Sequence, residues 1–359
     1  MNALSRPRLD RYPLAMLYRL HIVAIALMGL LVAPACIGAD SDQGDIVAYQ
    51  NSDGPPDHVE VGDLDADPRD EEELTDPGEF ERPDDVIDPP NGDDPLPDHL
   101  VLGPDDRPAN LLLPPDPPDA PIPVVILLHS YGSTASTQDL YFGLSQAQST
   151  RPFALMLPEG TSDITGQPFW NATSYCCDFY GSGVDDLSYL QGLIDELHDQ
   201  PTFDVDSLHL VGHSNGGFMA YRLACEAAEA IDSVVALGAS AQASPSACEP
   251  DDTTSILHIH GSMDAVIYYS GVLGFYPGAR TLARRWAERN DCRGNSEIAD
   301  YIDLDLLIPG NETSRRHFHG CPDTGDVQLW TILGGAHIPT LSTDFSDYIL
   351  DFSLANPDE

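Results

Sequence analysis

Apolar runs alternate with amphipathic stretches from about Leu100 to the C-terminus of the chain. The apolar runs have the length of buried strands and lie at 107–115, 123–132, 153–160, 208–212, 231–240, 255–262 and 326–335. Stretches with helical spacing lie at 184–200, 218–225, 279–290 and 341–354. Near-continuous apolar strands separated by amphipathic helices predict an α/β fold, with a mostly parallel central sheet covered by helices on both faces.

The first 35 residues have the pattern of an export signal. Several arginines precede the apolar run 21–32, which is shorter than a membrane span. Ala33-Pro34-Ala35 fits the small-residue rule for signal cleavage, and Cys36 follows in the position of a bacterial lipoprotein cysteine. We therefore predict a signal peptide at 1–35. Two outcomes stay open: the mature protein is either tethered to the membrane by a lipid on Cys36 or secreted freely.

Residues 36–98 differ sharply from the rest of the chain. The tract is rich in Asp, Glu, Pro and Gly and has almost no aromatic residues. Such a composition buries too little apolar surface to offset the entropy lost on ordering. We expect 36–98 to be an acidic, Pro-rich disordered tether, which places the folded catalytic domain at 99–359.

The charge balance excludes one class of partner. The formal net charge is −43, and all 16 basic residues are arginine because the chain contains no lysine. This excess of carboxylates repels phosphate backbones, so we expect no nucleic-acid partner.

We expect a monomer located outside the cell or in the cell envelope.

Six cysteines follow Cys36, and an even number in an exported chain predicts disulfides. Their proximity along the chain favours pairing Cys225 with Cys248 and Cys292 with Cys321. The adjacent residues Cys176 and Cys177 are then either joined to each other or bound elsewhere. A zinc site is excluded because the chain has no C-x2-C pair.

The segment 208–225, LHLVGHSNGGFMAYRLAC, contains the strongest chemical signal. An apolar strand is followed by a G-x-S-x-G sequence, Gly212 to Gly216, and then by a helix. This is the pattern of a nucleophile elbow, in which Ser214 occupies a sharp strand-to-helix turn. Gly212 and Gly216 relieve crowding at the turn, and Gly217 lets the helix pack closely on the sheet.

A serine nucleophile needs a histidine to accept its proton and a carboxylate to orient that histidine. Asp264 follows the apolar run 255–262, and His337 follows the run 326–335. The order serine, aspartate, histidine, with each residue after a strand, is typical of the α/β-hydrolase fold. We therefore predict Ser214, Asp264 and His337 as a catalytic triad.

The tetrahedral intermediate of acyl transfer needs backbone N–H donors. We expect Asn215, directly after the nucleophile, to supply one donor of the oxyanion hole, and Tyr131, in the turn that ends the run 123–132, to supply the other. Ser130 is the next candidate for the second donor and, with Trp170, a candidate substrate-binding residue. For Trp170 and Tyr131, packing is an equally good interpretation.

Other histidines of the chain have less specific contexts. His129, His258 and His260 are interpreted as hydrogen-bonding residues of the sheet or its loops. Zinc sites at His258/His260 or His317/His319 are disfavoured because no further ligand has a suitable spacing.

Several segments together resemble the polyhydroxybutyrate depolymerase and feruloyl esterase group of secreted α/β-hydrolases. They are LLHSYG, PEGT, FWNATSYCCDFYGSGVDDLSYL, VGHSNGGFMAYRLAC, LHIHGSMDAVI, WAERNDC and GGAHIP. The resemblance runs from about Leu100 to the C-terminus and implies the same triad. This chain departs from the group at Ser130, where the group usually has glycine, in the loop expected to supply the second oxyanion donor.

We therefore expect a secreted or lipid-anchored serine esterase that resembles polyhydroxybutyrate depolymerase and acts on a polyester. The alternatives are a feruloyl or acetyl esterase acting on acylated plant polysaccharide, and a non-catalytic surface binding protein on a hydrolase scaffold. The mechanism requires no cofactor and no metal. Many hydrolases insert a lid between the strands at 231–240 and 255–262, but only the short segment 241–254 separates them here, so we expect no large lid.

Overall fold

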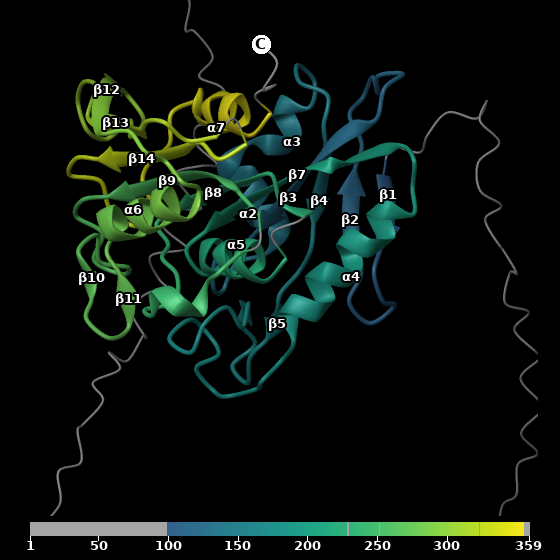
Figure 1. Cartoon of the computed structure of the whole chain (residues 1–359). Coiled ribbons are helices and arrows are strands. Elements are labelled where there is room, and N and C mark those ends of the chain that lie inside the picture. The colour runs from purple at the N-terminus through teal and green to yellow at the C-terminus, as the bar shows by residue number, and fades with distance from the viewer. Residues whose placement is uncertain (1–98, 228–229, 251, 323, 355–359) are drawn as a thin grey trace, which may run out of the picture. The chain divides into compact units, whose positions relative to one another are not determined.

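The computed structural model describes residues 99–354, apart from 228, 229, 251 and 323 (Figure 1). The predicted signal peptide, Cys36 and the predicted tether lie outside the described residues. Within the described part, no helix is long and apolar enough to cross a membrane.

A ten-stranded sheet forms the centre of the fold (Figure 1). Its spatial order is β1 (His99–Leu102), β2 (Ala109–Leu112), β4 (Ala154–Leu157), β3 (Ile122–Leu128), β7 (Phe203–His213), β8 (Ser233–Leu237), β9 (Ser255–Gly261), β14 (Val327–Ile332), β13 (Thr313–Phe318) and β12 (Ser296–Ile302). From β4 to β14 all neighbouring strands are parallel, whereas β1, β2, β12 and β13 pair antiparallel at the two edges. The predicted parallel centre is confirmed.

The apolar character of the central strands follows from burial on both faces. Every residue of β4 and β8 is buried, and so is nearly every residue of β3 and β9. By contrast, β12 is a mostly exposed edge strand that contains Glu297 and Asp300. The central strands were predictable from their apolar runs, whereas the hairpin of β12 and β13 has no apolar run and was not predicted.

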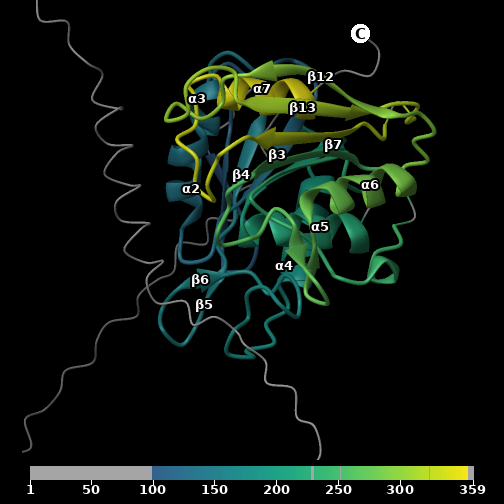
Figure 2. The same cartoon turned by 90° about the vertical axis from the view of Figure 1, so that its left-hand side faces the viewer.

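Helices cover both faces of the sheet (Figures 1 and 2). One layer contains α2 (Ala135–Phe142), α3 (Leu144–Ala147) and α7 (Phe345–Ser353), which pack into a shared apolar cluster with the strands. The other contains α4 (Asp186–His198), α5 (Asn215–Glu226) and α6 (Ala279–Arg289). Helix α4 begins as its sequence indicates, since the Asp185 side chain accepts a hydrogen bond from the Ser188 N–H.

Small elements occupy the loops that follow the strands. They are the hairpin of β5 (Thr161–Ser162) and β6 (Pro168–Phe169), the hairpin of β10 (Gly271–Val272) and β11 (Tyr276–Pro277), and a 3₁₀ turn, η3 (Pro245–Ala247). In the described residues between β8 and β9, η3 is the only helical element. No helical cap is therefore built from that segment.

Candidate active site

Ser214 lies on a sharp turn between β7 and α5. Its backbone φ of 52° and ψ of −119° lie in a region that side-chain-bearing residues rarely adopt. The turn closes only because its neighbours lack side chains. A Cβ at Gly212 would lie 2.6 Å from the Gly216 backbone, and one at Gly216 would lie 2.1 Å from the carbonyl oxygen of Leu128. The local structure is the elbow that the G-x-S-x-G pattern predicts.

Ser214, His337 and Asp264 form a hydrogen-bonded line across the ends of three strands. The Ser214 Oγ lies 2.9 Å from His337 Nε2, and His337 Nδ1 lies 2.8 Å from Asp264 Oδ2. Each side chain comes from a loop after a parallel strand: β7 for Ser214, β9 for Asp264 and β14 for His337. The structure thus brings together three residues that are far apart in the sequence.

Asp264 is buried and its carboxylate is saturated with donors. Oδ1 accepts hydrogen bonds from the backbone N–H groups of Val266 and Ile267, at 2.8 and 2.9 Å. Burial alone raises the pKa of this carboxyl, but hydrogen bonds from His260 and His337 outweigh burial and hold the pKa of Asp264 below its ordinary range. Asp264 therefore remains an anion that can orient His337.

His213 lies behind the line, next to His337. Its Nε2 lies 3.2 Å from the His337 carbonyl oxygen, so Nε2 carries the proton and donates it. Burial lowers the pKa of His213 to about 3, which keeps the ring neutral. No second positive charge therefore competes with an imidazolium at His337.

The loop after β3 faces the nucleophile turn and is held by several contacts. The Ser130 N–H donates to Gln138 Oε1 at 3.3 Å, and Gly132 N–H donates to Pro168 O at 2.8 Å. The Tyr131 hydroxyl donates to Asp163 Oδ2 at 2.5 Å. Because the Ser130 N–H already has an acceptor, Tyr131 is the better of the two candidates for a free backbone donor.

No protein-family model matches the chain. The acetyl xylan esterase from Aspergillus awamori superposes with a TM-score of 0.53 at 12% identity, over 72% of this chain and 99% of that one. This chain has the α/β-hydrolase fold.

In sequence, the chain is similar to an esterase group that includes feruloyl esterases. It is 25% identical over 227 residues to a putative esterase, NocK, of Nocardia uniformis, covering 60% of this chain and 64% of that protein. It is 24% identical over 202 residues to feruloyl esterase D of Neurospora crassa, covering 56% of this chain and 59% of that protein. The chain thus spans less than two thirds of the length of either relative.

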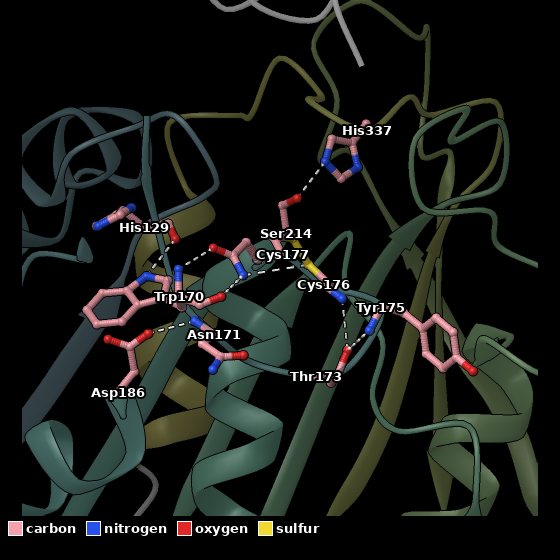
Figure 3. Close-up of a disulfide and its surroundings, with 11 residues drawn as sticks. His129, Trp170, Asn171, Thr173, Tyr175, Cys176, Cys177, Asp186, Ser214 and His337 are labelled. Carbon is pink, nitrogen blue, oxygen red and sulfur yellow. Dashed lines mark hydrogen bonds between the residues drawn. A yellow bond between two sulfur atoms is a disulfide. The ribbon is translucent and has the colours of Figure 1, made fainter. Parts of the chain in front are cut away.

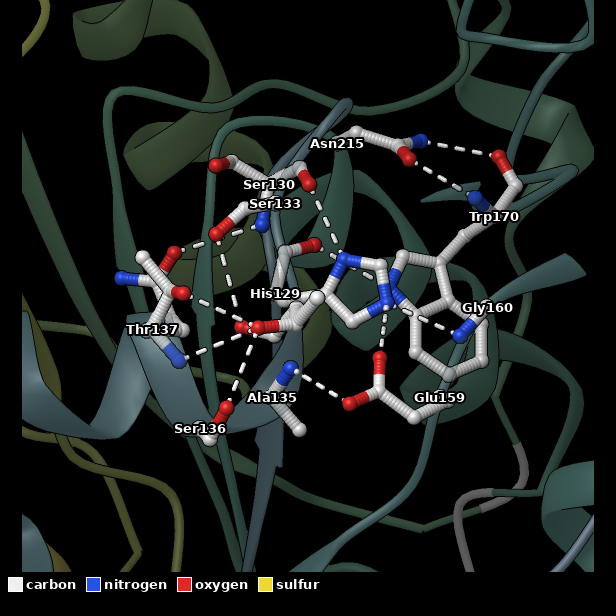
Figure 4. Close-up of polar contacts among 12 residues, drawn as sticks. His129, Ser130, Ser133, Ala135, Ser136, Thr137, Glu159, Gly160, Trp170 and Asn215 are labelled. Atoms are coloured by element: carbon white, nitrogen blue, oxygen red, sulfur yellow. Dashed lines mark hydrogen bonds and ion pairs between the residues drawn. The ribbon is translucent and has the colours of Figure 1, made fainter. Parts of the chain in front are cut away.

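The Asn215 side chain has a role that the sequence did not indicate (Figure 4). Its Oδ1 accepts from the Trp170 N–H at 2.7 Å, and its Nδ2 donates to the Trp170 carbonyl at 2.8 Å. Nδ2 also lies 3.6 Å from Cys176 Sγ. The side chain therefore ties the 170–177 loop to the nucleophile turn and leaves only the backbone N–H of Asn215 for an oxyanion.

The structure corrects the expectation that Trp170 binds substrate. Its side chain is 0% exposed, and its indole N–H donates to the His129 carbonyl at 3.0 Å (Figure 4). A side chain with no accessible surface cannot contact a substrate. Ser130 is partly exposed and remains a candidate.

His129 supports the same loop from below (Figure 4). Its Nδ1 donates to the Ser130 carbonyl at 2.9 Å, and its Nε2 accepts from the Gly160 N–H at 2.8 Å. Burial lowers the pKa of His129 to about 4, so the ring is neutral and its tautomer is fixed by these two partners. This matches the interpretation of His129 as a hydrogen-bonding residue.

Three disulfides are present in the described part of the chain. Cys176 pairs with its neighbour Cys177, Cys225 pairs with Cys248, and Cys292 pairs with Cys321. The last two are the pairs favoured by proximity, and the first is one of the two alternatives left open. Both cysteines of the adjacent pair are buried (Figure 3), and Asn215 Nδ2 lies 3.6 Å from Cys176 Sγ.

Metal ligation was disfavoured from the sequence, and the histidine pair in β9 has other partners. His258 and His260 contact each other and continue toward Asp264 on one side and Tyr221 on the other. Within the described ranges of 99–354, no group of at least three His, Cys, Asp or Glu side chains is placed to hold a metal ion.

Proposed function

We propose that this α/β-hydrolase cleaves carboxylic esters through an acyl-enzyme on Ser214. In the proposed reaction, the Ser214 hydroxyl attacks the ester carbonyl while His337 accepts its proton. His337 then protonates the leaving alcohol, and a water molecule activated by His337 releases the acid. Asp264 holds the imidazole in the tautomer that presents an unprotonated Nε2 to the serine.

One observation carries this proposal. The hydrogen-bonded line Asp264–His337–Ser214 ends on a strained elbow, and its two distances of 2.8 and 2.9 Å lie within the range required for proton transfer. A solvent-facing serine in an ordinary turn has no such partner. The relatedness to esterases supports the same class of reaction.

We infer that the oxyanion is bound by the backbone N–H groups of Asn215 and Tyr131. Asn215 is the first residue of α5, where the N–H groups have no partner within the helix and the helix dipole favours negative charge. Tyr131 is held by its hydroxyl bond to Asp163, which fixes the backbone of the loop.

For the substrate, we propose an acyl group carried on a polysaccharide. The relative from Neurospora crassa is named a feruloyl esterase, and a probable feruloyl esterase C of Aspergillus clavatus is 28% identical over 142 residues. These relatives favour the polysaccharide alternative over the polyester that we first expected.

A polyester remains the second candidate because of an apolar rim near the site. Exposed apolar side chains lie in 164–180, which includes β6, and in the loop and hairpin that follow β9. Tyr175 packs on Phe275 where these segments meet, with ring centroids 4.5 Å apart. The rim comprises Ile164, Tyr175, Phe179, Tyr180, Met263, Val266, Tyr268, Leu273 and Phe275. In 262–278 the only charged residue is Asp264, which is buried. The 262–278 part of the rim therefore has no exposed charge in an otherwise acidic chain, which suits an uncharged polymer.

We also propose that the protein works outside the cytoplasm. Its disulfides suit an oxidising compartment and agree with the predicted export signal. Radiolabelled lipid incorporation by the wild-type precursor, compared with Cys36→Ser, separates a membrane-anchored form from a freely secreted one.

The proposed function is tested with the purified protein and a panel of feruloyl, acetyl and 3-hydroxybutyrate esters. We expect turnover by the wild type, a loss of about 10⁴-fold or more in Ser214→Ala, and no change in Ser149→Ala, which alters an exposed serine on α3's C-terminal side. Cleavage of only the hydroxybutyrate oligomers would move the substrate to polyesters. If no ester is cleaved and an intact fold is verified, the non-catalytic binding protein is the better account.

A further inference from the structure

A second histidine lies against Asp264. His260 Nε2 lies 2.8 Å from the carbonyl oxygen of Ile267 and 3.3 Å from Asp264 Oδ2. Both neighbours are acceptors, so His260 Nε2 must carry a proton. This one N–H therefore reaches the two ends of the turn 264–267, which presents the carboxylate to His337.

The contacts continue away from the site as a buried chain. His260 Nδ1 lies 3.1 Å from His258 Nε2, and His258 Nδ1 lies 2.9 Å from the Tyr221 hydroxyl. The two histidines lie two residues apart in β9 and so share one face of the sheet. All three side chains are buried.

The direction of the chain follows from its two ends. Tyr221 donates its O–H to His258 Nδ1, His258 donates from Nε2 to His260 Nδ1, and His260 donates from Nε2 toward Asp264 and Ile267. Every ring is then neutral with one donor and one acceptor. Burial lowers the pKa of His258 and raises that of Tyr221, which agrees with neutral groups. In the reverse direction, His260 would have to donate from both nitrogens and carry a positive charge.

We propose that Tyr221, His258 and His260 are positioning residues that hold Asp264 at the distance its role requires. Tyr221 lies in α5, the helix that begins after the nucleophile, and Asp264 lies in the loop after β9. The chain of hydrogen bonds thus connects the nucleophile helix to the turn that carries the acid. This inference rests on the proposed ester hydrolysis.

Such bracing matters because Asp264 lies in a loop and not in a strand. A displacement of about 1 Å in a reacting group can cost about 10²-fold in rate. The other titratable groups near Asp264 are His337 in front, His213 behind His337, and Tyr276. Tyr269 packs edge-on against His260, with ring centroids 5.6 Å apart. Among the described residues, none of these donates to Ile267 O. The N–H groups of Val266 and Ile267 hold Oδ1 from within the turn, and His260 adds the contact to Ile267 O and lies beside Oδ2.

The test compares variants at His260 with a matched control. His260→Leu removes both nitrogens, His260→Gln keeps a donor near the Nε2 position, and Tyr221→Phe removes only the terminal donor. His209→Leu is the control, because His209 is also buried in the sheet but its side-chain partners in the described part of the chain are Ser207 and Ser233. Activity is measured as kcat and KM against pH, after the fold of each variant is checked.

We expect His260→Leu to lose about 10- to 100-fold in kcat with little change in KM. Its acid limb of kcat/KM should also move to higher pH. A carboxylate with one donor fewer attracts a proton on His337 more strongly, so protonation of His337 becomes more favourable. His260→Gln should recover to within about threefold of the wild type and Tyr221→Phe should be intermediate, whereas His209→Leu should leave both kcat and the limb unchanged.

Three results would overturn the inference. The first is a wild-type kcat and acid limb in His260→Leu while Ser214→Ala is inactive. The second, which decides if His260→Leu does not fold, is wild-type kinetics in folded Tyr221→Phe. The third is ¹⁵N NMR of the wild type at neutral pH showing a protonated His260 Nδ1. An active Ser214→Ala would instead refute the proposed function itself.

Discussion

Asp264→Asn changes one atom of the proposed triad while keeping the size of the side chain. The amide oxygen can keep the two backbone bonds from Val266 and Ile267, so the amide nitrogen takes the place of Oδ2. That nitrogen donates, which forces His337 Nδ1 to accept and puts the remaining proton on Nε2, opposite Ser214. The imidazole is then in the wrong tautomer to act as a base. The same amide also faces the N–H of His260 with no acceptor to offer.

We expect kcat to fall by about 10⁴-fold, equivalent to about 5.5 kcal/mol of transition-state stabilisation, with KM little changed. The assay is the initial rate of nitrophenyl ester hydrolysis at neutral pH, with thermal unfolding as the check on folding. Asp195→Asn, in an exposed position of α4, is the matched control and should retain wild-type activity. A folded Asp264→Asn variant within about tenfold of the wild type would refute the role assigned to this carboxylate.

Two further predictions concern the elbow and the buried histidines. Gly216→Ala places a methyl group 2.1 Å from the Leu128 carbonyl oxygen, so we expect about 1–3 kcal/mol of destabilisation and a loss of activity of about 10²-fold. Gly192→Ala, at an open position of α4, is the control and should be tolerated. Denaturant unfolding measures the stability of the two variants, and esterase rates measure their activity. Burial lowers the pKa of His209 to about 4, so the unfolded chain binds a proton that the folded chain does not as pH falls below about 6.5. The free energy of unfolding therefore falls as the pH falls through that window. Between pH 7 and 5 it should fall by about 2 kcal/mol less in His209→Leu than in the wild type. Equal decreases in both proteins would contradict this.

The nucleophile turn was predictable because its signal is local. Strand, serine and helix are contiguous at 208–225, and the two glycines that the turn requires flank Ser214 within that segment. Asp264 and His337 were found because each follows an apolar strand of a parallel sheet, and such strands end at the same edge. The geometry of the line itself comes only from the structure.

The remaining features depend on contacts that no local pattern encodes. Trp170 was expected to line the cleft because it is a large aromatic residue. Instead it is buried, with its backbone bonded to the Asn215 side chain and its indole N–H bonded to the His129 carbonyl. The link from Asp264 to Tyr221 runs through α5 and β9, which are distant in the sequence. Its one local sign was the H-x-H spacing in β9, which places both side chains on one face of the sheet but does not indicate their partners.

In the proposed reaction, Ser214 is an activated nucleophile. Treating the native protein with a fluorophosphonate, and measuring intact and peptide masses alongside ester turnover, tests this reactivity. We expect one adduct, located on Ser214, with activity lost in proportion to labelling, and no adduct in Ser214→Ala. A folded protein that stays unlabelled, or one that keeps its activity when fully labelled, would contradict the account.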